Sequence, residues 1–167
     1  MPAVIDEWSF ITKKEQVESH ISMLKRIKSF FYRNPDSYIG GKENPYLLRW
    51  HIIPRNRWFN IYLHKFLRDD DDRAMHDHPW YSVSLLVKGQ YIEQTDAGRK
   101  LFKVPRIIFR SATYKHRIEL IDNKPTWTIF ITGPMIREWG FHCPKGWVHW
   151  KSFVSKNDKG KTGKGCD

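Results

Sequence analysis

The feature that most constrains the fold is a series of short strand-like segments running from Tyr46 to about residue 131. Turn-forming residues separate the segments, and no helical pattern lies between them. Each is rich in β-branched and aromatic residues, and they follow one another at roughly ten-residue spacing. The eight segments are YLLRWHII, RWFNIYLHKF, WYSVSLLV, QYIEQ, RKLFKV, RIIF, HRIELI and PTWTIFI. This pattern predicts an all-β sandwich or barrel.

A helix is predicted before the strands, over about residues 13–33. Thr12 and Glu15 fit a capping box. Apolar residues then recur at helical spacing, at Val17, Ile21, Leu24 and Ile27. We expect this helix to pack on the outside of the barrel.

The chain is predicted to form one domain, residues 1–154, with the barrel over about 45–150. The last stretch, residues 155–167, is rich in Lys and Gly, and we expect it to be a mobile basic tail. The total of 167 residues suits one domain of ordinary size. The 8 Trp, 7 Tyr and 10 Phe residues provide enough apolar surface for a core and exclude a disordered chain.

The net charge of +11 is spread along the chain. This excess attracts phosphates and acidic ligands, but the sequence contains no recognisable nucleic-acid-binding module. A nucleotide or nucleic-acid partner is therefore open but not favoured. No apolar run is long enough to span a membrane, the N-terminus lacks the apolar stretch of a signal peptide, and two cysteines cannot build a disulfide scaffold. We expect a cytoplasmic protein without a membrane partner, and leave a homodimer open.

Three histidines are the strongest candidates for chemistry. In His76-Asp77-His78 the two histidines would point to the same face of a strand, so both could bind one metal ion. A third, His116, opens a later strand segment. The alternative is that His76 and His78 bond the acidic turn at Asp71 and Asp72.

The segment around these histidines resembles the first motif of the cupin superfamily. His76 and His78 match its two histidines, and Gly89 matches its closing Gly. Asp70 stands at the first Gly position and Ser82 at the Glu position.

His116 matches the metal-binding His of the second cupin motif, while Ser111 and Thr113 replace its Pro and Gly. The resemblance covers about residues 45–135. It implies a cupin-type double-stranded β-helix, or jelly roll, with a metal held by His76, His78 and His116.

The loss of the Glu leaves a three-histidine pattern that is similar to that of the thiol dioxygenases, such as cysteine dioxygenase. The stretches HDHPWYSVSLLVKGQY and HRIELIDNKPTWTIFITGP resemble its metal-binding strands. Ile129, Ile131 and Gly133 stand where that family carries Ser-x-His-x-Tyr. The resemblance implies Fe(II), although Mn, Co, Ni or Zn accept the same ligands.

Several residues are candidates for a substrate pocket. Tyr62, His64 and Phe66 alternate on one strand face, which either contributes to the pocket or is core. Arg49 lies on the early strands, where cysteine dioxygenase carries an arginine for the substrate carboxylate. Bidentate pairing makes arginine suited to a carboxylate or phosphate.

A second cluster, residues 138–150, contains three Trp and two His. It could form a lid in which Trp147 and His149 contact a planar ligand, or plug one end of the barrel. A zinc site from His142, Cys143, His149 and Cys166 matches no standard spacing.

These features favour a metal-binding cupin, interpreted as an Fe(II)-dependent, oxygenase-like enzyme for a small polar or anionic molecule. The alternative is a cupin without enzymatic activity that binds or sequesters a small ligand such as a nucleotide.

Overall fold

The structure is a computed structural model, and it describes residues 15, 17–22, 25, 29, 32–70, 74–158 and 161–167. The chain divides into two compact units, residues 1–34 and 35–167. In the first unit every described residue from 15 to 32 is helical. The rest of the helix expected over residues 13–33 lies outside the described residues, and its packing on the barrel stays a prediction. No helix among the described residues is long and apolar enough to cross a membrane.

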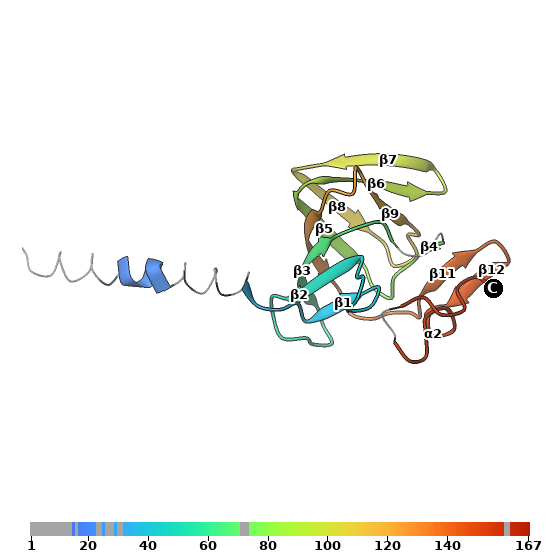
Figure 1. Cartoon of the computed structure of the whole chain (residues 1–167), viewed down its shortest axis with the longest axis horizontal. Helices are drawn as coiled ribbons and strands as arrows, with labels where there is room; N and C mark the ends of the chain where they lie inside the picture. Colours follow the sequence, from blue (N-terminus) through green and yellow to red (C-terminus); the bar gives the residue numbers. More distant parts are fainter. Residues whose placement is uncertain are drawn as a thin grey trace, which may run out of the picture. The chain divides into compact units, whose positions relative to one another are not determined.

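The described part of the second unit is built from twelve strands and one short helix (Figure 1). The elements are β1 (Ser37–Ile39), β2 (Leu47–His51), β3 (Asn60–Phe66), β4 (Met75–His76), β5 (Ser82–Lys88), β6 (Gln90–Thr95), β7 (Gly98–Lys103), β8 (Arg106–Arg110), β9 (Arg117–Leu120), β10 (Thr126–Thr132), β11 (Gly140–Cys143), β12 (Gly146–His149) and α2 (Trp150–Phe153). Each of the eight predicted segments contains a strand. The strands β1, β11 and β12 were not predicted, and of the strand expected at His76-Asp77-His78 only His76 lies in a strand, β4.

The strands form two layers. One is a six-stranded sheet in the order β1-β2-β3-β10-β5-β8. The other combines the sheets β7-β6-β9 and β12-β11-β4, which an antiparallel bridge between His76 and His116 connects. All pairings within the sheets are antiparallel. The result is a mainly β, double-stranded β-helix barrel of the cupin type, which confirms the predicted fold class.

The hydrophobic core lies between the two layers. Its buried side chains come from four strands of the six-stranded sheet and from all three strands of the β7-β6-β9 sheet. They are Leu47, Phe66, Leu86, Tyr91, Phe102, Ile108, Ile118 and Leu120. The turn between β5 and β6 requires Gly89, whose φ of 87° favours glycine. A Cβ at this position would lie 2.7 Å from Thr126 Oγ1. The closing Gly of the motif therefore permits a tight turn that takes the chain from one layer to the other.

The C-terminal residues are attached to the β11–β12 hairpin. In place of a free tail, the structure shows a disulfide between Cys143 of β11 and Cys166. Gly163 N and Gly165 N donate to Phe153 O at 2.9 and 3.2 Å. Composition reveals neither the covalent link nor these backbone hydrogen bonds. The Lys- and Gly-rich composition therefore did not predict this arrangement.

Candidate metal centre

The backbone places two of the three candidate histidines side by side. His76 N donates to His116 O at 2.9 Å, and His116 N donates to His76 O at 3.0 Å. Residues that exchange both hydrogen bonds in this way are direct antiparallel neighbours, and their side chains lie on the same face. His78 lies two residues beyond the end of β4. Its ring centroid is 5.1 Å from that of His76 and 5.2 Å from that of His116, so it lies on the same side.

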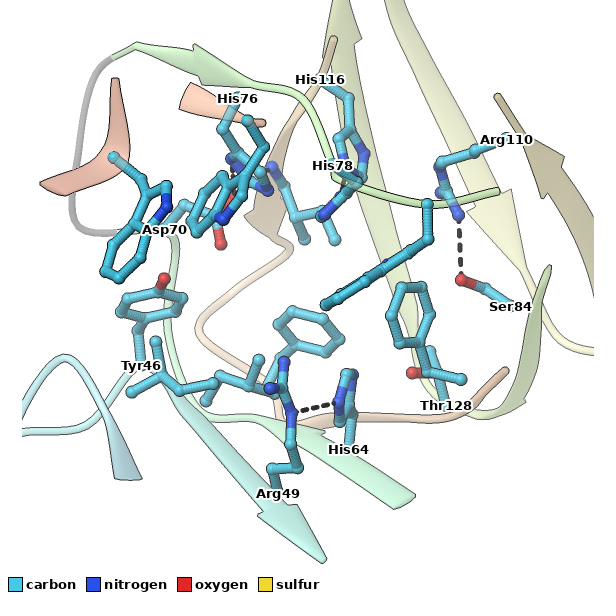
Figure 2. Close-up of a pocket in the computed structure, with 18 of the residues that line it drawn as sticks. Tyr46, Arg49, His64, Asp70, His76, His78, Ser84, Arg110, His116 and Thr128 are labelled. Atoms are coloured by element: carbon cyan, nitrogen blue, oxygen red, sulfur yellow. Dashed lines mark hydrogen bonds and ion pairs between the residues drawn. The ribbon is translucent and has the colours of Figure 1, made fainter. Parts of the chain in front are cut away.

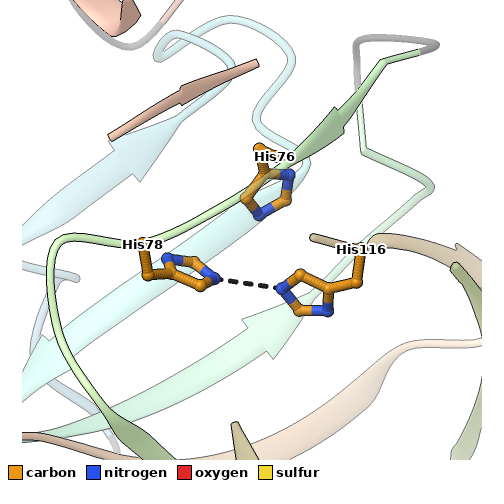
Figure 3. Close-up of side chains that lie close together, drawn as sticks. All are labelled: His76, His78 and His116. Carbon is orange, nitrogen blue, oxygen red and sulfur yellow. Dashed lines mark hydrogen bonds between the residues drawn. The ribbon is translucent and has the colours of Figure 1, made fainter. Parts of the chain in front are cut away.

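The three imidazoles converge on one point (Figure 3). One potential ligand atom from each of His76, His78 and His116 lies within 4.8 Å of the others. His78 Nε2 is 3.0 Å from His116 Nε2. Two nitrogens at about 2.1 Å from one metal ion, in neighbouring coordination positions, have about this separation.

Burial keeps these imidazoles neutral, as metal ligands must be. It lowers the pKa of His78 and of His116 well below the usual value, and nearby cationic groups act in the same direction. Burial also lowers the pKa of His76, partly offset by Asp70 and Asp77. His76 Nδ1 is buried without a hydrogen-bond partner among the described residues. This donor set fits a divalent transition metal.

Carboxylates lie behind two of the histidines. Glu93 Oε1 is 2.6 Å from His116 Nδ1, and Asp70 Oδ2 is 3.9 Å from His76 Nδ1. Burial raises the pKa of Asp70, while its Oδ2 accepts a hydrogen bond from Ile118 N at 2.9 Å. Asp71 and Asp72, the alternative partners expected for the histidines, lie outside the described residues.

The histidines form part of the wall of a cavity of about 280 Å³ (Figure 2). Arg49 and His64 line it as well, and they come from paired positions of β2 and β3. Arg49 Nε donates to His64 Nε2 at 2.8 Å. Burial, followed by the charge of Arg49, lowers the pKa of His64 well below its usual value, so the ring is a neutral acceptor.

The alternating residues of β3, Tyr62, His64 and Phe66, differ in whether they line the cavity. Phe66 lines the cavity with His64. Tyr62 is buried behind the wall, stacks on His64 with ring centroids 5.8 Å apart, and carries the Arg49 guanidinium 4.8 Å above its ring. Tyr62 therefore supports the cavity residues instead of lining the cavity.

The strands opposite the histidines present different residues from those that the motifs suggested. On β5, Ser84 lines the cavity, whereas Ser82 lies at a separate surface depression. On β10, Thr128 and Phe130 line it. Strand alternation then turns the neighbouring Ile131 to the outer face of the sheet, where it is exposed.

The Trp- and His-rich segment 138–150 forms a hairpin that contributes to a cavity wall. Trp139, Phe141 and Trp150 line the cavity, and Trp139 stacks on Trp150. Trp147 and His149 are not among the lining residues. His149 Nε2 is instead 2.8 Å from Glu138 Oε2.

The zinc site considered above, from His142, Cys143, His149 and Cys166, does not form. Cys143 and Cys166 are joined to each other, so neither offers a free thiolate. Among the described residues, the group that could hold a metal is His76, His78 and His116.

Asp77, between the two histidines, faces away from the cavity and connects β4 to this hairpin. Its Oδ1 accepts from Gly140 N at 2.8 Å. Its Oδ2 accepts from Trp147 Nε1 at 3.2 Å and pairs with Arg137 Nη1 at 3.1 Å. Sequence reasoning assigned Asp77 no role, although an acidic residue between two inward-facing positions must point outward.

Sequence reasoning also missed the buried ion pair of Glu93 and Arg110. Arg110 Nε and Nη2 donate to Glu93 Oε1 at 2.8 and 2.6 Å. Arg110 Nη1 donates to Ser84 Oγ at 2.9 Å, and Nη2 donates to Tyr91 Oη at 2.9 Å. The only sequence signal was the alternation of Glu93 with Tyr91, which places both on the inner face of β6.

No family model matches the chain, and no curated protein is similar to it. A conserved protein with a double-stranded β-helix domain from Klebsiella pneumoniae superposes with a TM-score of 0.49 at 14% identity, over 64% of this chain and 91% of that chain. A cupin domain from Bordetella pertussis gives a TM-score of 0.43 at 13% identity, over 56% and 98%. The DMSP lyase DddQ from Ruegeria pomeroyi gives 0.49 at 10% identity, over 68% and 61%. At such identities the likeness concerns the fold alone.

Proposed function

We propose that this chain is a metal-dependent, oxygenase-like enzyme that acts on a small anionic molecule, with Fe(II) as the favoured metal. The observation that carries the proposal is the convergence of three neutral imidazoles at the wall of a buried cavity that also contains an arginine. His76, His78 and His116 would hold the metal.

The donor set determines what kind of metal chemistry is available. Three imidazoles suit Fe(II), and also Mn, Co, Ni or Zn. A metal held by these three ligands supplies Lewis-acid or redox chemistry at its open coordination positions.

The chain's own residues would bind and orient the substrate. Arg49 commits its Nε to His64, and Figure 2 shows its guanidinium directed into the cavity. The two terminal nitrogens can therefore donate to a carboxylate or another small anion in the bidentate manner of arginine. Since His64 accepts at Nε2, this pair fixes the plane of the guanidinium before a ligand binds.

The aromatic walls of the cavity would limit the size of the ligand and exclude water. Phe66 and Phe130 lie near His64, while Trp80 and Trp139 close other parts of the lining. A cavity of about 280 Å³ admits a small molecule and excludes a polymer. Removal of water strengthens the attraction between the anion and the guanidinium.

The test begins with metal content. Protein purified without chelator should contain close to one equivalent of a transition metal, and His20→Ala, on an exposed part of the N-terminal helix, should keep it. A content below about a tenth of an equivalent that Fe(II) addition fails to restore would overturn the proposal.

Oxygen consumption separates catalysis from simple binding. Fe(II)-loaded protein is assayed with a panel of thiols and small carboxylates, and Arg49→Met serves as the variant that keeps the metal ligands. Substrate-dependent oxygen uptake that Arg49→Met reduces supports the enzyme. Metal binding without oxygen uptake for any panel member refutes the oxygenase and leaves the ligand-binding cupin.

A further inference from the structure

Glu93 is the best-connected buried side chain behind the metal centre. Its side chain is 1% exposed and has partners on both oxygens. Oε1 interacts with His116 Nδ1 and with Arg110, and Oε2 accepts from Tyr114 Oη at 3.0 Å. Charged groups at this depth are normally paired or hydrogen-bonded in this way.

The contacts at Oε1 determine which atom carries the proton on His116. Guanidinium nitrogens only donate, so Oε1 already accepts two hydrogen bonds from Arg110 at 2.8 and 2.6 Å. A proton on Oε1 would collide with those donors. His116 Nδ1, 2.6 Å from the same oxygen, must therefore be the donor. A neutral imidazole has one such proton, so Nε2 of His116 has a free lone pair.

That lone pair faces the other histidines, because His116 Nε2 is the atom 3.0 Å from His78 Nε2. Metal-binding histidines commonly donate their second nitrogen to a carboxylate, which sets the tautomer and the ring orientation.

Arg110 prevents Glu93 from approaching the metal position itself. The guanidinium is attached to β5 through Ser84 and to β6 through Tyr91, and Figure 2 shows Arg110 and Ser84 at the cavity wall. The carboxylate is thereby held at the back of His116, and its charge is balanced by Arg110. This explains how a neutral three-histidine set exists with a buried glutamate in contact with one of its members.

We infer that Glu93 is a positioning residue of the metal centre, which fixes His116 in the Nδ1–H tautomer and keeps its Nε2 directed at the metal without becoming a ligand. The inference rests on the proposed metal site. It assigns the ion pair of Glu93 and Arg110 a role in metal affinity in addition to its role in the core.

The experiment compares Glu93→Gln with Glu119→Gln. Glu119 is a matched control because it also lies on a strand of the same sheet and pairs with two arginines, Arg99 and Arg117, but on the outer face. Histidine ¹⁵N spectra of the metal-free proteins report the tautomer, and competition with a chelator for Zn²⁺ or Fe²⁺ reports the affinity.

We expect His116 to be protonated at Nδ1 in the unmodified protein and in Glu119→Gln, and to lose this preference in Glu93→Gln. The affinity for the metal should fall 10- to 100-fold in Glu93→Gln and stay within about twofold in Glu119→Gln. A tautomer with the proton on Nε2 of His116 in the unmodified protein, or an unchanged affinity in folded Glu93→Gln, overturns the inference.

Tyr114→Phe keeps the test decisive if Glu93→Gln does not fold. It removes only the hydrogen bond to Oε2, so the Nδ1–H tautomer should persist while the affinity for the metal falls by less than about 10-fold. Loss of the tautomer in this variant would refute the role given to Oε1. If the unmodified protein shows the expected tautomer but binds no metal, the proposed function fails while the hydrogen-bond assignment stands.

Discussion

Acid should unfold the metal-free protein unusually steeply, because its cavity histidines are buried in the neutral form. The pKa values of His64, His78 and His116 are all lowered well below 6.5 in the folded chain, with burial as the main cause. Below about pH 6.5 the unfolded chain therefore binds protons that the folded chain does not bind. The free energy of unfolding is fully retained above this pH and falls as the pH drops.

The magnitude follows from proton linkage. Each such histidine contributes about 1.4 kcal/mol per pH unit in the window between its folded and unfolded pKa values. The three together give a limiting slope of about 4 kcal/mol per pH unit. Asp70 acts in the opposite direction, since burial raises its pKa and the folded chain then binds a proton more readily, which offsets at most about 1.4 kcal/mol per unit.

The assay is urea unfolding of chelator-treated protein, followed by tryptophan fluorescence from pH 7.5 to pH 5.0. A slope of about 4 kcal/mol per pH unit removes about 6 kcal/mol between pH 6.5 and pH 5.0. A metal-free barrel at the lower end of the usual stability of about 5–15 kcal/mol should therefore unfold near pH 5. His78→Gln should reduce the slope by the share of one histidine, whereas His20→Gln, on an exposed part of the N-terminal helix, serves as the control. A slope below about 1.4 kcal/mol per pH unit, or equal reductions in both variants, would refute the neutral, buried state assigned to these rings.

Other perturbations should affect the metal, the anion and the C-terminal hairpin separately. Substitution of any one metal ligand by Ala, in His76→Ala, His78→Ala or His116→Ala, should remove most of the bound metal, as measured by elemental analysis, and full retention in all three would place the metal elsewhere. Arg49→Met should lower the affinity for small carboxylates about 10- to 100-fold without changing the metal content. The absorption of the Co(II)-loaded protein measures this affinity, and equal affinities in the two proteins would show that Arg49 does not bind the anion. Cys166→Ser opens a link across a sequence separation of 23 residues and should cost about 3 kcal/mol in urea unfolding, and no loss would mean that the disulfide does not form. Gly140→Ala places a Cβ 2.2 Å from Val148 O and should destabilise the protein by about 1–3 kcal/mol; a fully stable variant would contradict the tight pairing of β11 and β12.

The barrel strands could be predicted because they are rich in β-branched and aromatic residues, and several of them alternate buried and less buried positions. β5 shows this clearly, with Ser82, Ser84 and Leu86 buried and the residues between them partly exposed. β4 contains only two residues, too few for any periodicity. β11 and β12 contain or adjoin Gly140, Gly146 and several aromatic residues, so their composition did not indicate a hairpin.

The metal ligands could be predicted from strand alternation, whereas the groups behind them could not. The spacing of His76 and His78 is local, so it is visible in the sequence. Glu93 and Arg110 are 17 residues apart and meet only when β6 and β8 are folded into different layers. Charged residues on short strand segments are normally solvated, and the alternation of Glu93 with Tyr91 was the only sign in the sequence that this glutamate is buried.

The alternation at Asp77 has a consequence for the order in which the protein can be made. Its carboxylate receives hydrogen bonds from residues 63 to 70 positions later in the chain, and β4 pairs with β11 directly. A growing chain that has emerged only as far as β10 contains all three histidines but lacks the segment that holds β4 in place. We therefore expect metal capture at the proposed centre to follow the synthesis of β11, because a shorter chain would hold β4 only through its bridge to His116.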